Sequence, residues 1–327
     1  GCGPQDEYAL TPEQRAANPA LPATFCTSDY VRDYLSITAP IERWGVSGRV
    51  TADLSDSVQA YAMANFVQTH TDYEGTPVQL RRATPPLIGP QVSTAALALP
   101  VYICPDGIDC ETDPLRILNP QNPFASAGSQ ARIVGHLPGL VETNDIRTRG
   151  LRGAMGVSGD LGGWRFNVDA TAMRVRTRWI QTGVFYFANL IHAINTGELN
   201  LVNPELNSQE TLDFVLPDNS NTSKSTMLQV QASVARDLFE LPGGPLQAGL
   251  GASIRRETVN APSANPERDS EGNPTEVFED IDPTQRWSDR INPFGVIGKR
   301  TVKSVYGELL APVLDTLDVN LSGRYDS

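Results

Sequence analysis

The chain has 327 residues, of which 40% are hydrophobic and 20% are charged, and its formal net charge is −12. This composition excludes a wholly disordered chain, and the acidic balance argues against a nucleic-acid-binding surface. No apolar run reaches the about eighteen residues of a transmembrane helix. The first residues lack the pattern of a signal peptide. We therefore expect the chain to be an internal piece of a longer protein.

Residues 1–43 are rich in Pro, Asn and Asp and are predicted to form mostly loop, with a short helix that is capped by Thr11 and has Pro12 at its first position. A different pattern begins near Trp44. From Val46 to Leu54, small or apolar residues alternate with polar ones, which predicts a β-strand between two unlike surroundings. A tight turn at residues 55–57 and a second alternating strand over residues 58–69 complete a hairpin.

The connection that follows, residues 70–145, contains many prolines and shows no sustained period. Such a stretch is unusual inside a compact soluble domain. A second hairpin is predicted over residues 146–158 and from Trp164 onward, around a turn at residues 159–163. Beyond Met173, the face that was apolar carries Arg174, Arg176 and Arg178. This change predicts that the strand passes there from apolar surroundings, such as lipid, into water.

The rest of the chain repeats the same plan. A second long connection, residues 179–223, contains an apolar stretch, 185–194, that fits either a helix or a strand. The third hairpin spans residues 228–255 around a turn at 241–245. A third connection, residues 260–298, is acidic between residues 267 and 289, and its spacing predicts a solvated loop because it does not match an EF-hand calcium loop. The fourth hairpin has strands at residues 299–311 and 317–326.

Eight strands joined alternately by short turns and long loops are typical of a transmembrane β-barrel. In lipid, only a closed barrel satisfies every backbone group of a set of strands. The polar face would then line the lumen, and its charged candidates are Arg49, Arg165, Asp169, Arg255 and Arg324. Aromatic residues near strand ends fit either interfacial girdles or ordinary packing: Trp44, Phe66, Trp164, Phe239 and Tyr325.

The four cysteines bear on the compartment. Cys104 and Cys110 bracket a turn-forming stretch, so a disulfide between them is one expectation, and it implies an oxidising compartment. Cys2 and Cys26 could pair likewise. Four cysteines allow three pairings, and free thiols in a reducing cytosol are the alternative.

Chemical motifs point away from catalysis. His70, His136 and His192 lie far apart, outside any metal-ligand spacing, and no nucleophile elbow or nucleotide-binding glycine loop occurs. We therefore predict a protein that is not an enzyme and has no cofactor and no metal centre.

The last hairpin carries a specific resemblance. Residues 292–295 read Asn-Pro-Phe-Gly, residues 306–312 read Tyr-Gly-Glu-Leu-Leu-Ala-Pro, and the returning strand ends in Arg324-Tyr325-Asp326. This order is similar to the barrel of TonB-dependent outer-membrane receptors. The segment from Leu241 to Glu257 resembles another hairpin of that family, and Asn122-Pro123-Phe124 resembles its loop returns. The likeness covers most of residues 40–327.

The resemblance implies an all-β fold, in which about eight strands belong to an antiparallel barrel of about 22 strands. It implies import of a scarce ligand (a ferric siderophore or other metal chelate, a vitamin or a glycan) across a Gram-negative outer membrane. The implied partners are outer-membrane lipid and the inner-membrane TonB-ExbB-ExbD complex, which acts through a plug. No plug, no TonB-box and no C-terminal aromatic residue occur in this sequence. The expected organisation is therefore a partial extracellular loop (residues 1–43) and a partial barrel (44–327).

Two alternatives remain open at this point. A passive porin-type channel needs neither plug nor energy. A soluble secreted β-sandwich that binds sugars or cells would need no membrane.

Overall fold

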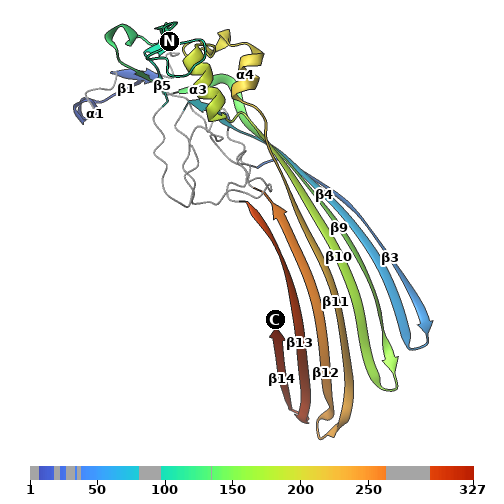
Figure 1. Cartoon of the computed structure of the whole chain (residues 1–327). Helices are drawn as coiled ribbons and strands as arrows, with labels where there is room; N and C mark the ends of the chain where they lie inside the picture. Colours follow the sequence, from blue (N-terminus) through green and yellow to red (C-terminus); the bar gives the residue numbers. More distant parts are fainter. Residues whose placement is uncertain are drawn as a thin grey trace.

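The computed structural model describes residues 7–17, 23–26, 34, 38–80, 97–133, 135–262 and 295–327. One antiparallel sheet of eight strands dominates it (Figure 1), and strands adjacent along the sheet follow one another in the chain. The predicted all-β class and eight long strands are confirmed. The strands are β3 (Ile41–Ser55), β4 (Val58–Leu80), β9 (Gly135–Leu161), β10 (Trp164–Thr182), β11 (Asn219–Leu241), β12 (Gly244–Ala261), β13 (Val296–Leu314) and β14 (Leu317–Asp326).

Four tight turns join these strands at one end of the sheet (Figure 1). The turn between β9 and β10 contains only Gly162 and Gly163, with φ of 63° and 79°. Two left-handed residues in a two-residue loop are typical of a type I′ turn, whose twist matches that of the flanking strands. The Asp160 carboxylate accepts a hydrogen bond from Gly163 N at 3.0 Å. The predicted turn at residues 159–163 is therefore too long, because Gly159 and Asp160 still belong to the strand.

The strands also extend farther from the turns than predicted. β4 continues beyond residue 69 to Leu80, and β9 already begins at Gly135, so the irregular connection predicted over residues 70–145 is wrong at both ends. The β4–β9 ladder runs to the pair Leu80 and Gly135, with register shifts around Pro77. Proline lacks the N–H that a ladder needs, which explains the shift. Hydrophobic alternation disappears here, although the backbone pairing continues.

A folded cap sits at the end of the sheet opposite the tight turns (Figure 1). Its helices are α3 (Phe187–Thr196) and α4 (Gln209–Val215), with the 3-10 turns η1 (Ala125–Ala127) and η2 (Pro204–Leu206). Its short strands pair as β5 (Ala98–Leu99) with β8 (Ala131–Arg132), and β6 (Tyr102–Ile103) with β7 (Ile117–Leu118). The apolar stretch at residues 185–194 is thus mostly helical, and Gly197 closes α3 in a left-handed conformation, φ 80°.

The hydrophobic core lies in this cap and at the adjoining ends of β4 and β9, not under the middle of the sheet. It joins both long connections, and its most completely buried members include Phe185, Leu190, Leu199 and Val215. The Gln121 side chain ties the two connections together, because its amide donates to Leu199 O and its carbonyl accepts from Leu201 N, each at 2.9 Å. The connections were predicted as irregular loops, whereas much of the described part is packed structure.

Near the N-terminus, α1 (Pro12–Ala17) confirms the predicted helix start, and β1 (Glu7–Ala9) pairs with β2 (Thr24–Cys26). Thr11 N donates to Gln14 Oε1 at 2.9 Å while Gln14 N donates to Thr11 Oγ1 at 3.3 Å, which is a capping box. Across the described residues, no helix has the length and apolar character needed to cross a membrane.

Candidate functional site: the two faces of the sheet

The register of the eight strands places all the predicted apolar positions on one face. A single row of paired residues crosses the whole sheet. Its members are Ala52, Ala60, Val157, Val168, Ala232, Ala252, Val305 and Tyr325. Because side chains alternate between faces, the rows two residues away lie on this face too. We call it the apolar face and its opposite the polar face.

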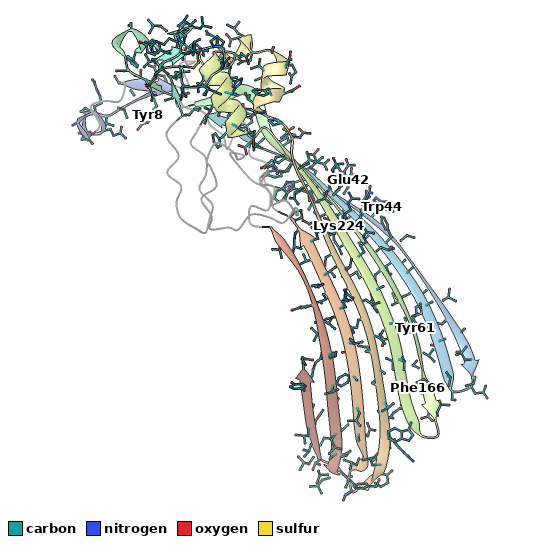
Figure 2. All side chains as sticks on the ribbon, in the orientation of Figure 1. Tyr8, Glu42, Trp44, Tyr61, Phe166 and Lys224 are labelled. Atoms are coloured by element: carbon teal, nitrogen blue, oxygen red, sulfur yellow. A yellow bond between two sulfur atoms is a disulfide. The ribbon has the colours of Figure 1, made fainter. Side chains whose placement is uncertain are left out.

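The apolar face is the more exposed of the two. Val50, Met155 and Leu250 are 71%, 64% and 63% exposed. Over residues 171–178 of β10, 228–235 of β11 and 250–256 of β12 the burial pattern alternates, with apolar-face residues exposed and polar-face residues partly buried. Figure 2 shows side chains projecting from both faces of the strands. This distribution inverts that of a soluble protein, which buries its apolar face.

The apolar band has the same length on five of the eight strands, whereas it is shorter on β11 (residues 228–234) and longer on β9 (151–161). It extends over residues 46–54 of β3, 58–66 of β4, 164–172 of β10, 246–254 of β12 and 305–313 of β13. Each of these segments has about nine residues, which is the length of a strand that crosses a bilayer at a tilt.

The edges of the band cross the strands obliquely. We counted along each strand from the row that crosses the sheet toward the cap, as far as the first polar residue on the apolar face. That residue lies about eight residues away on β9 (Arg149), about six on β10 (Arg174), about four on β12 (Arg256) and about two on β13 (Lys303). At the other end of the sheet, the positions of the tight turns relative to this row are displaced along the strands in the same direction. With strands about 4.8 Å apart and residues about 3.3 Å apart, one to one and a half residues per strand correspond to a tilt of roughly 35–45°. Strands of membrane barrels have this tilt.

All five predicted lumen residues lie on the polar face, and four of them interact with other charged or aromatic groups. Arg49 lies over the ring of Tyr61, 4.7 Å from its centroid. Arg165 pairs with Asp237 at 2.9 Å, and Arg255 with Glu257 at 3.1 Å. Arg324 bonds Asp326 at 2.9 Å and the Ser304 hydroxyl at 3.0 Å.

The fifth predicted residue, Asp169, organises a network of amides. Its Oδ2 accepts from the side-chain amides of Asn167 and Gln231, each at 2.9 Å. Gln229 in turn donates to Gln231 at 2.9 Å. These contacts run along β10 and β11 and hold the amides in fixed directions. The resulting surface offers hydrogen-bonding groups and charges of both signs, which suits a hydrated passage for a polar solute.

Two tyrosines fill the space beside glycines on the polar face, a feature that sequence reasoning missed. Tyr306 lies against Gly251, and Tyr61 lies against Gly156, each pair being directly opposite across neighbouring strands. A Cβ at Gly251 would lie 2.2 Å from Tyr306 Cζ, so the ring occupies the site of the missing side chain. Aromatic cover of glycine pins the register of a curved sheet. Gly251 and Tyr306 are far apart in sequence, which hides the pairing.

The disulfide candidates lie in the cap. Cys104 and Cys110 are joined by a disulfide, with 5.3 Å between their Cα atoms. Their loop docks on the end of α3, where Asn195 Nδ2 donates to Gly107 O at 2.9 Å and Cys104 N donates to Asn195 O at 3.0 Å. Cys2 and the side chain of Cys26 lie outside the described residues.

The aromatic candidates lie on the apolar face near the edges of the band. The ring centroids of Trp44 and Phe66 are 5.1 Å apart at the cap-side edge of the band. Tyr325 also lies at this edge, because the edge crosses the strands obliquely and reaches the row of Val305 and Tyr325 near β14. Trp164 and Phe239 lie near the turns, 42% and 59% exposed. Trp44, Trp164, Phe239 and Tyr325 remain exposed, whereas Phe66 is half-buried beside Trp44, so packing within the described sheet accounts for Phe66 alone.

The histidines lie apart. His70 bonds Asp145 at 3.0 Å near the cap-side end of β4, whereas His192 packs edge-on against Phe214 between α3 and α4. No group of three potential metal ligands occurs among the residues that the structure describes. The acidic segment at residues 267–289 lies outside them.

In comparison with known proteins, no protein-family model and no curated protein matches the chain.

Proposed function

We propose that the chain is part of the transmembrane β-barrel of a TonB-dependent receptor in a Gram-negative outer membrane. One observation carries this proposal: an apolar band about nine residues deep crosses all eight strands on the exposed face, with oblique edges. An exposed apolar surface of this extent is unusual for a soluble monomer, but it is what a bilayer requires of a barrel. This argument also disfavours the soluble sandwich.

The sheet edges favour a barrel with more than eight strands. Within the described residues, β3 and β14 each pair along one side only. An open edge in hydrocarbon leaves N–H and C=O groups without partners, at several kcal/mol each. The proposed barrel therefore continues through further strands beside β3 and β14. The large folded cap suits a wide barrel, because a core built from both long connections needs a broad rim.

The resemblance in the last hairpin favours the proposed receptor over a porin. β13 and β14 place the family-like residues Tyr306 and Glu308 opposite Arg324 and Ser322 on the polar face, where Asn320 donates to Glu308 at 2.8 Å. Under the proposal, this face meets the plug or the solute. The cap and plug hold a scarce ligand (a metal chelate, a vitamin or a glycan), and the TonB-ExbB-ExbD complex supplies the energy for its passage.

Uptake by cells that produce the full-length protein tests this function. Cells are given a panel of ferric siderophores, cobalamin and oligosaccharides, with and without a protonophore, and a strain lacking the gene is the control. Uptake of one compound that stops with the protonophore supports the receptor. Uptake that continues without an energised inner membrane would instead support a passive channel. Extraction of the folded protein without detergent would contradict both.

A further inference from the structure

Cations mark the cap-side edge of the apolar band. Leaving the band toward the cap, the first polar residue of the apolar face is an arginine or lysine on four of the five strands from β9 to β13. On β11 the first polar residue is Thr226, and Lys224 lies two residues farther toward the cap. We call the cations of this edge the cationic edge: Arg149, Arg174, Arg176, Lys224, Arg256 and Lys303. All six side chains are exposed.

The cationic edge concentrates charge of one sign. Arg176 stands directly opposite Arg149 on one side and Lys224 on the other. Opposed residues have Cβ atoms only about 5 Å apart, and like charges in such positions destabilise a sheet. No carboxylate of the described residues forms an ion pair with these six cations, and the one side-chain bond in the group is from Arg149 to Gln68 Oε1 at 2.8 Å. The polar face differs, since Arg165, Arg255 and Arg324 there have acidic partners.

The opposite edge of the band lacks this feature. Near the turns, the apolar face of the described strands carries one cation, Arg236, and it lies over the ring of Trp164 at 5.3 Å. General snorkelling of long side chains would favour cations at both edges. The difference between the edges, in a chain with a net charge of −12, points to an anion on the cap side alone.

We propose that the cationic edge binds the phosphate groups of the glycolipid in the membrane leaflet on the cap side, the lipopolysaccharide of the outer leaflet. This inference rests on the proposed function, because it needs the apolar face to meet lipid with the long loops outward. Phosphates of the lipid headgroup lie at the boundary where the acyl chains end, and the first polar residues of the strands lie at the same depth. Guanidinium groups bind phosphate through two parallel hydrogen bonds, so arginine suits this position. Cations on five neighbouring strands fit a headgroup with more than one phosphate.

Binding of lipid A to the full-length protein in detergent tests the proposal. The probes are bisphosphorylated lipid A, the same lipid after removal of its phosphates, and phosphatidylglycerol. The edge variant is Arg174→Gln with Arg176→Gln, and the matched control is Arg43→Gln with Arg152→Gln. The control removes the same charge from the polar face, on β3 and β9. Heat-modifiable migration of each variant shows first that the barrel has formed.

We expect lipid A to bind about ten-fold more tightly than its dephosphorylated form, and the edge variant to lose about ten-fold in affinity, as for charge-assisted bonds at a partly exposed site. The control should change by less than about two-fold. Equal affinity for the two forms of lipid A, equal loss in both variants, or equal binding of phosphatidylglycerol would overturn the proposal while leaving the barrel intact. A protein that is soluble without detergent would overturn the proposed function first.

Discussion

Substitution of a residue in the middle of the apolar band by arginine tests directly whether that face contacts lipid. Val168 lies on β10 at the centre of its nine-residue band segment and is 44% exposed, between Val157 and Ala232 on the neighbouring strands. If lipid covers it, Val168→Arg places a charge near the bilayer midplane, which costs about 2–4 kcal/mol in barrels. The folding equilibrium should then fall roughly 30- to 800-fold.

The neighbouring position supplies the control. Asn167 faces the other way and donates to Asp169 at 2.9 Å. Asn167→Arg replaces that bond with an ion pair on the hydrated face, so we expect a change below about 1 kcal/mol. The assay is urea unfolding of the full-length protein in phospholipid vesicles, followed by tryptophan fluorescence and gel migration. Equal costs at the two positions, or a cost for Val168→Arg below about 1 kcal/mol, would refute the assignment of the faces.

Other substitutions test the remaining features. Gly156→Ala would place a Cβ 2.7 Å from Tyr61 Cε1 and 2.8 Å from the carbonyl oxygen of Val168, so we expect the free energy of unfolding in the same urea assay to fall by roughly 1–3 kcal/mol. A Cβ at Gly48 meets nothing within 4 Å, so Gly48→Ala should be neutral. Equal effects of the two substitutions would contradict the aromatic cover of glycine. Replacing Cys104 and Cys110 by serine should weaken the cap by about 2 kcal/mol and speed proteolysis of its loop without changing sheet protection, and unchanged proteolysis would exclude a stabilising disulfide. Leu190→Ala, at a fully buried cap position, should lower hydrogen-exchange protection of α3 by about 2–5 kcal/mol, and a smaller drop at α3 than in β11 would contradict a cap core separate from the sheet.

The sheet was predictable where each strand has two unlike surroundings. In the band, alternation of period two locates the strands to within a few residues, and the registers confirm that Val46, Leu151 and Leu250 share a face. On the cap side of the apolar band, polar residues predominate on both faces of the strands, so no hydrophobic alternation marks the strands there. Pairing along the backbone extends β4 by about eleven residues past the predicted end, and backbone hydrogen bonds leave no composition signal.

The cap was not predictable for a different reason. Its core brings together residues from both long connections, such as Leu99 and Leu190, and its polar contacts join Gln121 to Leu199. Neither connection shows a periodic pattern by itself, because each supplies only part of the buried surface. The candidate lumen residues followed from the face assignment alone. Their partners, such as Asp237 for Arg165 and Gln231 for Asp169, depend on register between distant strands.

The alternation of lipid contact along β10 tests the central claim most directly. A spin label is placed in turn at residues 166 to 170 of the full-length protein in vesicles, and its accessibility is measured to oxygen, which dissolves in lipid, and to a water-soluble nickel complex. We expect oxygen to dominate at 166, 168 and 170, and the nickel complex to dominate at 167 and 169. A uniform profile, or the opposite alternation, would show that the apolar face does not meet the membrane.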